Sequence, residues 1–471
     1  MRHCDLCVIG SGPGGYKAAI QAAKLGKDVV VIEKMQVVGG VAINTGTIPS
    51  KALREAVLAV TGASRLITGL VDQLDPATRL ERMTEACRRV IAAEVEVVRQ
   101  QLQSNGVEIL NGHATFKDPN TILADGVRGT ETVIADRILI AVGTTPARAQ
   151  GVEFDGHILM TSDDLLKLGK LPRTMIVVGG GVIGTEYASM FAALGTRVTI
   201  VEGRPRLLDF IDAEICEALQ YHLRQMGVTL RLGEKVSGVR KIDAPRAGRN
   251  GEIYAAEAML ESGKTIVADC LVHAIGRQGA TAALGLDKVG LSADNRGRIK
   301  VNEHYQTEVP HVYAVGDVIG FPALASTSME QGRLAACHMF NEPAQSYADL
   351  VPYGIYSIPE ISMVGWTEER LTQEQIPYET GIAQYKEIAR GQLIGDEIGM
   401  LKLLVHSETH ALLGVHAIGS GATELIHIGQ AIMAFKGTAE YLVNTVFNYP
   451  TLAECYKVAG FNVMNKLKHL T

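Results

Sequence analysis

Long apolar runs and basic tracts are both missing from this chain of 471 residues. A membrane-spanning helix needs about 20 apolar residues in succession. The least charged stretch, residues 174–185, contains four glycines and is followed by Glu186. With a net charge of −6 and no polybasic patch, neither nucleic acid nor a membrane surface is an expected partner. The first residues show neither a signal peptide nor an Arg-rich transit segment, which predicts a cytoplasmic protein.

Cysteine is scarce as well, and the seven cysteines are scattered along the chain. Their odd number suits a reducing compartment. Cys4 and Cys7 form a CxxC pair, which could be a redox pair or half of a zinc site. No second CxxC follows, and both residues fall on one predicted strand, where positions three apart point to opposite faces. We therefore expect two structural cysteines and no metal site.

The composition is that of a soluble globular protein, with 47% apolar and 20% charged residues. At this length we expect two to four domains rather than a single core. Glycine is frequent, and much of it lies in two turns that suggest where those domains bind their ligands.

The first turn lies within residues 6–33, which read as strand, glycine-rich turn, helix and strand. Glycines at residues 10–15 allow a tight turn and let a pyrophosphate approach the N-terminus of the helix. Glu33 ends the second strand, 33 − 15 = 18 residues after the last glycine. This is near the spacing of about 20 at which an acid binds a ribose hydroxyl in dinucleotide folds.

The pattern recurs later in the chain. A strand at Met175–Val178 precedes glycines at 179–184, a helix from Thr185 to about Leu194, and a strand at Arg197–Val201. Glu202 again follows the last glycine by 202 − 184 = 18 residues. One such turn is weak evidence, but two complete units with the same spacing predict two dinucleotide-binding folds rather than two turns that bind nothing.

Residues 39–51 read GGVAINTGTIPSK and resemble the redox segment of the flavoprotein disulfide reductases, roughly GGTCxNxGCxPSK. Ala42 and Thr47 stand where that family has its two redox cysteines. Neither side chain can form or break a disulfide. The resemblance therefore implies a flavin enzyme without the dithiol relay.

Four further segments resemble motifs of the same family, in the same order. Residues 112–116 resemble the stretch beside the flavin adenine, and residues 140–146 the strand that closes the first flavin lobe. Residues 274–277 resemble the strand that closes the NAD lobe, and residues 307–317 the motif whose aspartate binds the ribityl chain.

The resemblance implies an α/β fold with two Rossmann-like three-layer dinucleotide-binding domains and a C-terminal α+β dimerisation domain. The FAD-binding domain is expected over 1–146 and 276–346, the NAD(P)-binding domain over 147–275, and the dimerisation domain over 347–471. Residues 77–105 read as a long charged amphipathic helix, which we expect to pack on the flavin lobe; a partner-binding coil is the alternative. Its apolar positions are Leu80, Met83, Cys87, Val90 and Ile91.

By the same resemblance, the residues expected at FAD are Gly10, Gly12, Gly14, Gly15, Glu33, Lys34, Gly39, Gly40, Val41, Ala42, Thr47, Lys51, Ala114, Gly143, Gly316 and Asp317. Those expected at NAD(P) are Gly179, Gly181, Ile183, Gly184, Glu186, Glu202, Arg204, Arg206 and Gly276. Lys51 matches a family lysine that lies by the flavin ring and pairs with a glutamate, here Glu186. A lysine at a helix start is disfavoured by the helix dipole and so needs another reason for its place.

Tyr449 stands where the family has its catalytic histidine, and Glu454 matches that histidine's partner. A tyrosine, with a reference pKa of about 10, cannot do a histidine's acid–base work near neutral pH. Both cysteines and the base are thus absent together, which points to a different electron acceptor. Whether Tyr449 acts in the reaction or fills space stays open.

Residues 38–57, 356–362 and 447–451 narrow the resemblance to the soluble, energy-independent pyridine nucleotide transhydrogenases of this family. It implies the reaction NADPH + NAD⁺ ⇌ NADP⁺ + NADH, with ping-pong transfer through flavin N5. It also implies one non-covalent FAD per subunit, NAD(H) and NADP(H) as substrates, no metal, and a homodimer or a higher homo-oligomer.

Such an enzyme must accept both nucleotides. Glu202 suits the free 2′-OH of NAD, while Arg204 and Arg206 can pair with the 2′-phosphate of NADP. The alternative is a loop of solvated arginines. Rival functions are an NAD(P)H:quinone or dye oxidoreductase, a nucleotide-sensing flavoprotein without turnover, and a lipoamide dehydrogenase-like disulfide reductase.

Overall fold

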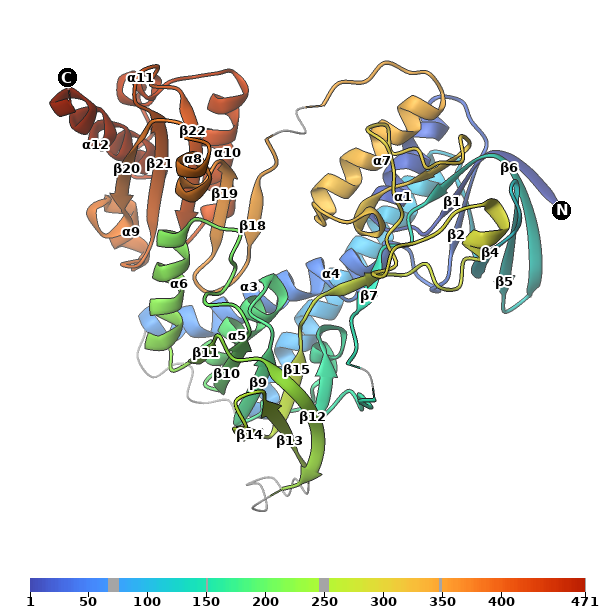
Figure 1. Cartoon of the computed structure of the whole chain (residues 1–471), viewed down its shortest axis with the longest axis horizontal. Helices are drawn as coiled ribbons and strands as arrows, with labels where there is room; N and C mark the ends of the chain where they lie inside the picture. Colours follow the sequence, from blue (N-terminus) through green and yellow to red (C-terminus); the bar gives the residue numbers. More distant parts are fainter. Residues whose placement is uncertain (67–75, 150, 245–253, 347–349, 471) are drawn as a thin grey trace. The chain divides into compact units, whose positions relative to one another are not determined.

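The computed structural model describes residues 1–66, 76–149, 151–244, 254–346 and 350–470 (Figure 1). The chain forms two compact units. The first comprises Met1–Ala59, Asp72–Ala149 and Gly276–Ser346, and the second comprises Val60–Val71, Gln150–Ile275 and Tyr347–Thr471. None of the described helices has both the length and the apolar character that a membrane crossing requires.

The first unit is built on a seven-stranded mixed sheet of order β3-β2-β1-β6-β5-β4, with β17 paired to β6. Its β1, β2, β3, β6 and β17 pair in parallel, and β4 and β5 extend the sheet as an antiparallel meander. The strands are β1 (Arg2–Ile9), β2 (Val29–Glu33), β3 (Glu108–Asn111), β4 (His113–Asp118), β5 (Thr121–Gly126), β6 (Gly129–Ile140) and β17 (Val312–Ala314).

Helices cover the parallel part of this sheet, and α1 packs alongside α7 (Figure 1). The helices are α1 (Pro13–Lys24), α2 (Gly40–Asn44), α3 (Thr47–Leu66), α4 (Pro76–Ser104) and α7 (Ala325–Met339). A two-stranded antiparallel ribbon, β7 (Thr144–Pro146) with β16 (Arg277–Gly279), joins the segment Asp72–Ala149 to the segment Gly276–Ser346. Apolar side chains of α1 and β2 form one core cluster with those of the helix α4.

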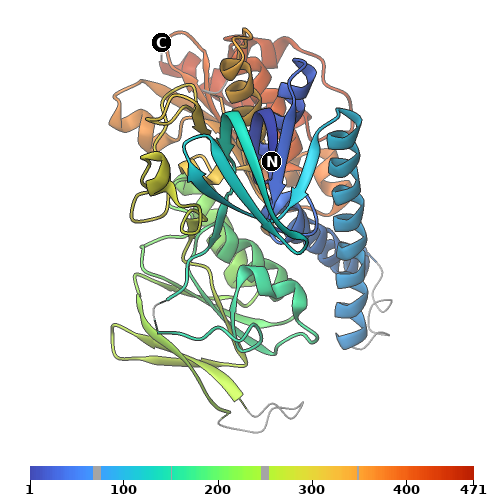
Figure 2. The same ribbon diagram turned by 90° about the vertical axis from the view of Figure 1, so that its right-hand side faces the viewer.

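The long helix predicted for residues 77–105 is confirmed as α4, which Figure 2 shows as one continuous helix (blue). Val95, Val98 and Leu102 of α4 lie in the core of the first unit, so the helix packs on this unit as expected. The prediction that Val90 belongs to the apolar face of this helix was wrong. Its side chain is exposed, because the buried stripe continues through Ile91 to Val95 instead.

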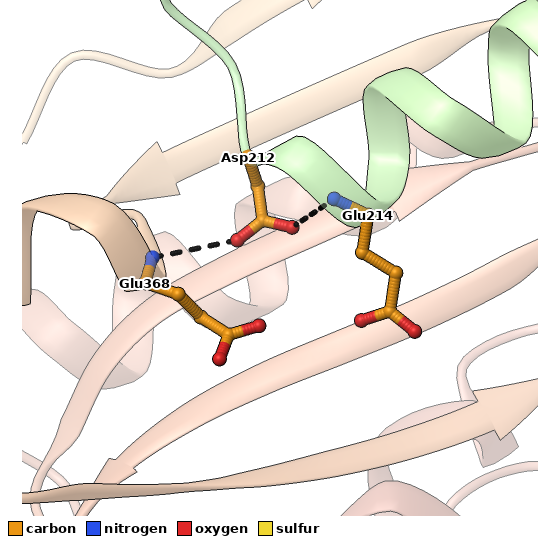
Figure 3. A group of neighbouring side chains, drawn as sticks. All are labelled: Asp212, Glu214 and Glu368. Atoms are coloured by element: carbon orange, nitrogen blue, oxygen red, sulfur yellow. Dashed lines mark hydrogen bonds between the residues drawn. The ribbon is translucent and has the colours of Figure 1, made fainter.

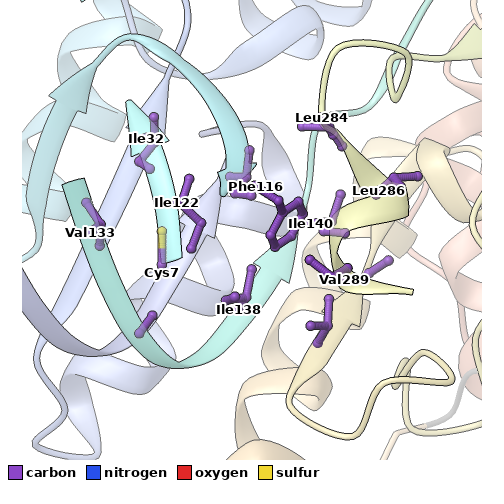
Figure 4. Packing of buried hydrophobic residues seen from close by; sticks show 14 of the residues in the cluster. Cys7, Ile32, Phe116, Ile122, Val133, Ile138, Ile140, Leu284, Leu286 and Val289 are labelled. Carbon is purple, nitrogen blue, oxygen red and sulfur yellow. The ribbon is translucent and has the colours of Figure 1, made fainter. Parts of the chain in front are cut away.

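The second core cluster of the first unit lies on the other face of the sheet (Figure 4). It contains both Cys4 and Cys7, so the prediction that they point to opposite faces was wrong. The paired strand β6 shows the same change, since Ala135 and Ile138 also belong to this cluster. The alternation of side chains slips by one residue in both strands between these positions. Both cysteines are free, and burial raises the pKa of Cys4 to about 12, which keeps the thiol protonated.

The second unit contains a five-stranded parallel sheet of order β11-β10-β9-β15-β8. A separate antiparallel sheet, β12-β13-β14, packs on it through a shared apolar core. The predicted strands and helix of the second nucleotide unit are confirmed, with the helix beginning at Val182 rather than Thr185. The elements are β8 (Leu159–Thr161), β9 (Thr174–Val178), α5 (Val182–Ala193), β10 (Arg197–Glu202), α6 (Ala213–Gln225), β11 (Thr229–Leu232), β12 (Val236–Asp243), β13 (Tyr254–Leu260), β14 (Thr265–Ala268) and β15 (Cys270–His273).

The C-terminal part of the second unit is an antiparallel sheet of order β18-β19-β22-β21-β20 with helices packed against it. This is the α+β arrangement expected for the C-terminal part, and the strands predicted near 353–355 and 401–406 are present as β18 and β21. The elements are β18 (Tyr353–Ile355), β19 (Ile361–Gly365), α8 (Glu368–Gln373), β20 (Tyr378–Gln384), α9 (Ala389–Ile394), β21 (Met400–His406), β22 (Leu412–Ile418), α10 (Ala422–Ala434), α11 (Ala439–Asn444) and α12 (Glu454–Leu470).

Candidate functional site

The turn between β1 and α1 can be made only by glycine at two positions. Gly10 has φ of +100°, and a Cβ atom there would lie 2.5 Å from the carbonyl oxygen of Ala141. A Cβ on Gly15 would lie 1.9 Å from the carbonyl oxygen of Gly10. Real Cβ contacts do not approach this closely, so the turn and the helix start are packed backbone against backbone. The N-terminus of α1 is thereby held open to an anion such as a pyrophosphate.

Glu33 closes this turn from the end of β2. Its Oε2 accepts hydrogen bonds from the backbone N–H of Ser11 at 2.9 Å and from the Ser11 hydroxyl at 2.6 Å. Its Oε1 accepts from the N–H of Met35 at 2.9 Å. The acid that the spacing predicts for a ribose is therefore fixed beside the glycine turn.

The segment that lacks the two cysteines lies on this same turn. The Gly39 N–H donates to the Ser11 hydroxyl oxygen at 3.0 Å. A Cβ on Gly40 would lie 2.8 Å from the Cα of Gly12. Ala42 lies in α2 and Thr47 begins α3, one turn before Lys51, whose Nζ donates to the Ser50 hydroxyl at 3.2 Å. The redox segment thus keeps its place on the dinucleotide turn although it has no sulfur.

Asp317 lies in the 3-10 helix Gly316–Ile319 that follows β17. Thr144 donates from its hydroxyl to Asp317 Oδ2 at 3.3 Å and accepts from Arg277 Nε at 2.9 Å. Burial raises the pKa of Asp317 above its ordinary value, and the charge of Arg277 offsets part of that rise. A partly buried carboxyl group with room for a further partner fits a site where a ligand hydroxyl would complete its hydrogen bonding.

The second glycine turn repeats the first. Gly179 has φ of +107°, and its Cβ would lie 2.5 Å from the carbonyl oxygen of Ala274. A Cβ on Gly184 would lie 2.0 Å from the Gly179 oxygen. The Gly180 N–H donates to Glu202 Oε2 at 2.6 Å, as Ser11 does to Glu33 in the first turn. Two turns of the same geometry, each with its acid, therefore stand in the two units.

Both arginines after Glu202 are paired with acids in partly exposed ion pairs. Arg204 makes a bidentate pair with Glu202, with Nε–Oε1 and Nη2–Oε2 both at 3.0 Å, and its Nη1 pairs with Asp209. Arg206 Nη1 pairs with Glu369 at 3.2 Å. Burial alone would raise the pKa of Glu202, but the hydrogen bonds and charge of Arg204 hold it below its ordinary value.

Glu186 is buried on α5 and joins the nucleotide part of the second unit to its C-terminal part. Its Oε1 accepts from the N–H of Tyr356 at 2.8 Å. One turn later, the Ser189 hydroxyl oxygen accepts from the N–H of Ile358 at 2.9 Å. These two bonds fix the rotation of α5 about its axis. Lys51, its predicted partner, belongs to the first unit.

Tyr449 is 68% exposed, as expected for a residue that would complete a site on another subunit. Glu454 begins α12, and its Oε2 is buried with no hydrogen-bond partner among the described residues. A buried carboxylate oxygen without a donor is costly.

The remaining predicted site residues lie around the two turns and the strands that close them. Gly143, Gly276 and Gly316 all have positive φ, the conformation that favours glycine at a close approach. The others occupy turns, strand ends and helix starts: Gly14, Lys34, Val41, Ala114, Gly181 and Ile183. Three residues inside the predicted motifs also hold these groups although they were not predicted as site residues: Ser11, Thr144 and Arg277. Two further ones, Asp209 and Glu369, lie outside the motifs.

An unexpected cluster of three carboxylates, Asp212, Glu214 and Glu368, has the spacing of a metal site (Figure 3). Lys402 fills it. Its Nζ lies 2.9 Å from Asp212 and 2.8 Å from Glu214 and also contacts Glu368, and its side chain is fully buried. Burial alone would lower the pKa of Lys402, but the hydrogen bonds that it donates to these acids raise it above its ordinary value. The cluster is thus an ammonium site that ties α6 to β21 and α8.

Comparison with known proteins gives consistent matches over the whole chain. Residues 4–332 match the pyridine nucleotide-disulphide oxidoreductase family, and residues 351–459 match its dimerisation domain. A protein named soluble pyridine nucleotide transhydrogenase from Mycobacterium bovis is 54% identical, over 100% of this chain and 99% of the relative. Proteins of the same name from Marinobacter nauticus and Yersinia enterocolitica are 43% and 44% identical, each over 99% of both chains.

Solved structures agree with these matches. LpdA from Mycobacterium tuberculosis superposes with a TM-score of 0.87 at 26% identity, over 98% of this chain and 99% of LpdA. The HOCl-induced flavoprotein disulfide reductase RclA from Escherichia coli superposes with a TM-score of 0.83 at 26% identity, over 96% of this chain and 98% of RclA. The fold is therefore shared with a protein named as a flavoprotein disulfide reductase.

Proposed function

The chain belongs to the pyridine nucleotide-disulphide oxidoreductase family, and from this premise we infer that it is a soluble pyridine nucleotide transhydrogenase. It exchanges hydride between NADPH and NAD⁺. The observation that carries this conclusion is the presence of two equivalent dinucleotide turns in a chain whose redox segment has Ala42 and Thr47 in place of sulfur. With no thiol to receive electrons, a second nicotinamide nucleotide is the acceptor that the remaining machinery can bind. We place the enzyme in the cytoplasm.

The first unit is proposed to hold FAD, which when bound supplies the group that accepts a hydride from one nucleotide and returns it to the next. The glycine turn at Gly10 and Gly15 would leave room for the pyrophosphate, since any side chain there meets backbone. Glu33 would bind the adenosine ribose and Asp317 the ribityl hydroxyls. The unfilled hydrogen-bonding capacity and raised pKa of Asp317 support this assignment.

The second unit is proposed to hold NAD(H) or NADP(H) in turn. Gly179 and Gly184 would admit the pyrophosphate, and Glu202 would bind the adenosine ribose. We propose that Lys51 lies near the flavin ring and stabilises negative charge on it. Within the second unit, the bond from the N–H of Tyr356 holds the carboxylate of Glu186 in place.

Mixing the purified yellow protein with NADPH and thio-NAD⁺ tests the function directly. The expected result is NADPH-dependent reduction of thio-NAD⁺ with parallel lines in double-reciprocal plots, as ping-pong transfer requires. Rapid reduction of a quinone without transfer to thio-NAD⁺ would instead identify the oxidoreductase alternative. Failure of both nucleotides to bleach the flavin would identify a sensing protein without turnover.

Replacing both Arg204 and Arg206 by alanine is expected to weaken the binding of NADPH far more than the binding of NADH. Charge-assisted hydrogen bonds contribute about 1.5–3 kcal/mol each, so kcat/KM for NADPH should fall at least about tenfold. NADH has no 2′-phosphate and should be little affected. Steady-state kinetics with each nucleotide as the donor measures the difference. Equal changes in KM for the two nucleotides would contradict the assignment of these arginines.

The C-terminal region is proposed to pair two subunits, in line with its match to the dimerisation domain. Tyr449 would then approach the partner's flavin. Because hydride exchange needs no protonatable side chain, we expect Tyr449→Phe to leave kcat unchanged, measured with NADPH and thio-NAD⁺. A large fall in kcat without a change in oligomeric state would show that the phenol takes part in the reaction.

A further inference from the structure

We propose that Asp209 and Glu369 are specificity-determining residues that compete with the 2′-phosphate of NADP(H) for Arg204 and Arg206. The proposal rests on the proposed function and extends it to two acids outside the predicted nucleotide motif. Glu369 comes from α8 of the C-terminal region, more than 160 residues along the chain from the arginine that it holds.

All three guanidinium nitrogens of Arg204 already face carboxylate oxygens. Two of them bind Glu202, and Nη1 binds Asp209. Arg206 is held in the same way, with Nη1 on Glu369 at 3.2 Å and Nη2 on the backbone carbonyl of Asp209 at 3.1 Å. A guanidinium has five N–H donors, so a phosphate that binds either arginine shares it with a carboxylate that is already bound.

The two nucleotides need different binding groups from this loop. NAD(H) needs only an acceptor for its ribose hydroxyls, and Glu202 can serve without moving either arginine. NADP(H) brings a phosphate dianion, which competes with Asp209 and Glu369 for the guanidinium groups and is repelled by the charge of these acids. Asp209 and Glu369 therefore oppose NADP(H) binding and leave NAD(H) binding unaffected.

Glu369 is anchored independently of the arginine that it holds. Its Oε1 also accepts from the N–H of Ala213, the first residue of α6, at 3.0 Å. Its neighbour Glu368 contacts the buried Lys402. This anchoring keeps Glu369 in place when Arg206 leaves it, so the acid remains as a fixed competitor. Both acids are about half exposed, with 45% for Asp209 and 43% for Glu369, which leaves room for an incoming phosphate.

The test compares binding of 2′,5′-ADP and 5′-AMP to the FAD-loaded enzyme by calorimetry, for wild type, Asp209→Asn and Glu369→Gln. Each substitution keeps the shape of the side chain and removes its charge. The Kd for 2′,5′-ADP is expected to fall about two- to fivefold per substitution, the range that corresponds to an exposed ion pair. The Kd for 5′-AMP should not change. Kinetics should show the same division, with a lower KM for NADPH and an unchanged KM for NADH.

Glu374→Gln is the matched control, because it removes one negative charge from an exposed residue just after α8. It should change neither Kd. Weaker binding of 2′,5′-ADP in the two variants would overturn the proposal and show that the acids hold the arginines ready for the phosphate. An equal gain in affinity for 2′,5′-ADP and 5′-AMP, or a gain in affinity in Glu374→Gln, would mean that the overall charge alone causes the effect. Either result would also overturn the proposal. These binding outcomes do not depend on hydride transfer, so failure of the transhydrogenase assay remains a separate result.

Discussion

Replacing Gly15 by alanine is expected to give protein without flavin, whereas Gly184→Ala is expected to give a yellow protein that neither nucleotide reduces. The physical cause is the same in both turns. The added Cβ would lie 1.9 Å from the Gly10 oxygen in one and 2.0 Å from the Gly179 oxygen in the other. Relieving such overlap moves the helix start away from the strand, at a cost of about 1–3 kcal/mol, or roughly 5- to 150-fold in ligand affinity.

The measurements are the flavin content of the purified protein and bleaching of the flavin band by NADH and NADPH. Gly169→Ala is the control, because a Cβ at this exposed position in the second unit meets no atom within 4 Å. It should behave as wild type in both measurements. Loss of flavin in Gly184→Ala with normal flavin in Gly15→Ala would reverse the assignment of the two lobes. Normal behaviour of both would show that neither turn carries a nucleotide.

Replacing Lys402 by methionine is expected to be the most destabilising single substitution considered for this protein. The ammonium is fully buried among Asp212, Glu214 and Glu368. Removing one member of a buried ionic cluster leaves the others uncompensated, which costs about 3–5 kcal/mol. The unfolding midpoint of the second unit should fall by about 6–10 °C, from a shift of roughly 2 °C per kcal/mol for a unit of this size.

Thermal unfolding followed by circular dichroism measures this loss. Lys264→Met is the matched control, because Lys264 pairs with Glu234 at 2.7 Å but is 61% exposed. Its removal should leave the midpoint nearly unchanged, since an exposed pair is screened by water. An unchanged midpoint in Lys402→Met would show that the three acids take up protons or repack without the ammonium.

The difference in unfolding midpoint between wild type and Lys402→Met should depend on pH, as the directions of the pKa shifts show. Burial alone would raise the pKa of Asp212, but His416 and Lys402 hold it below its ordinary value. Asp212 therefore stabilises the folded state above the pKa of the unfolded chain, and this contribution is lost as the pH falls through the folded value. The pKa of Lys402 is raised, so its contribution is complete below its ordinary pKa and is lost only at strongly alkaline pH.

The difference in unfolding midpoint between wild type and Lys402→Met should consequently be largest near neutral pH. It should narrow as the pH falls towards 4, because protonation removes the charge of the unpaired acids in the variant. Midpoints measured from pH 4 to pH 9 test this expectation. A gap that widens in acid would mean that the cluster is not held by its charges.

Much of the nucleotide-binding arrangement could be predicted because it is local. Each turn and its acid lie within about 30 residues of chain, and the positions of the glycines and the acid are fixed by strand and helix geometry. The prediction for the two cysteines at the N-terminus failed for the opposite reason. The alternation of side chains slips in β1 together with β6, a strand more than 120 residues away, and no local pattern reports such a shared irregularity.

The sequence by itself determined the two glycine turns, the acids that follow them and the loss of sulfur at Ala42 and Thr47, because each depends on residue identity and short spacing. Only the tertiary structure decided which acids hold Arg204 and Arg206, and that Lys402 fills what resembles a metal site. These pairings join residues from different parts of the chain. Their partners are set by how sheets and helices pack, which charge and spacing along the sequence do not specify.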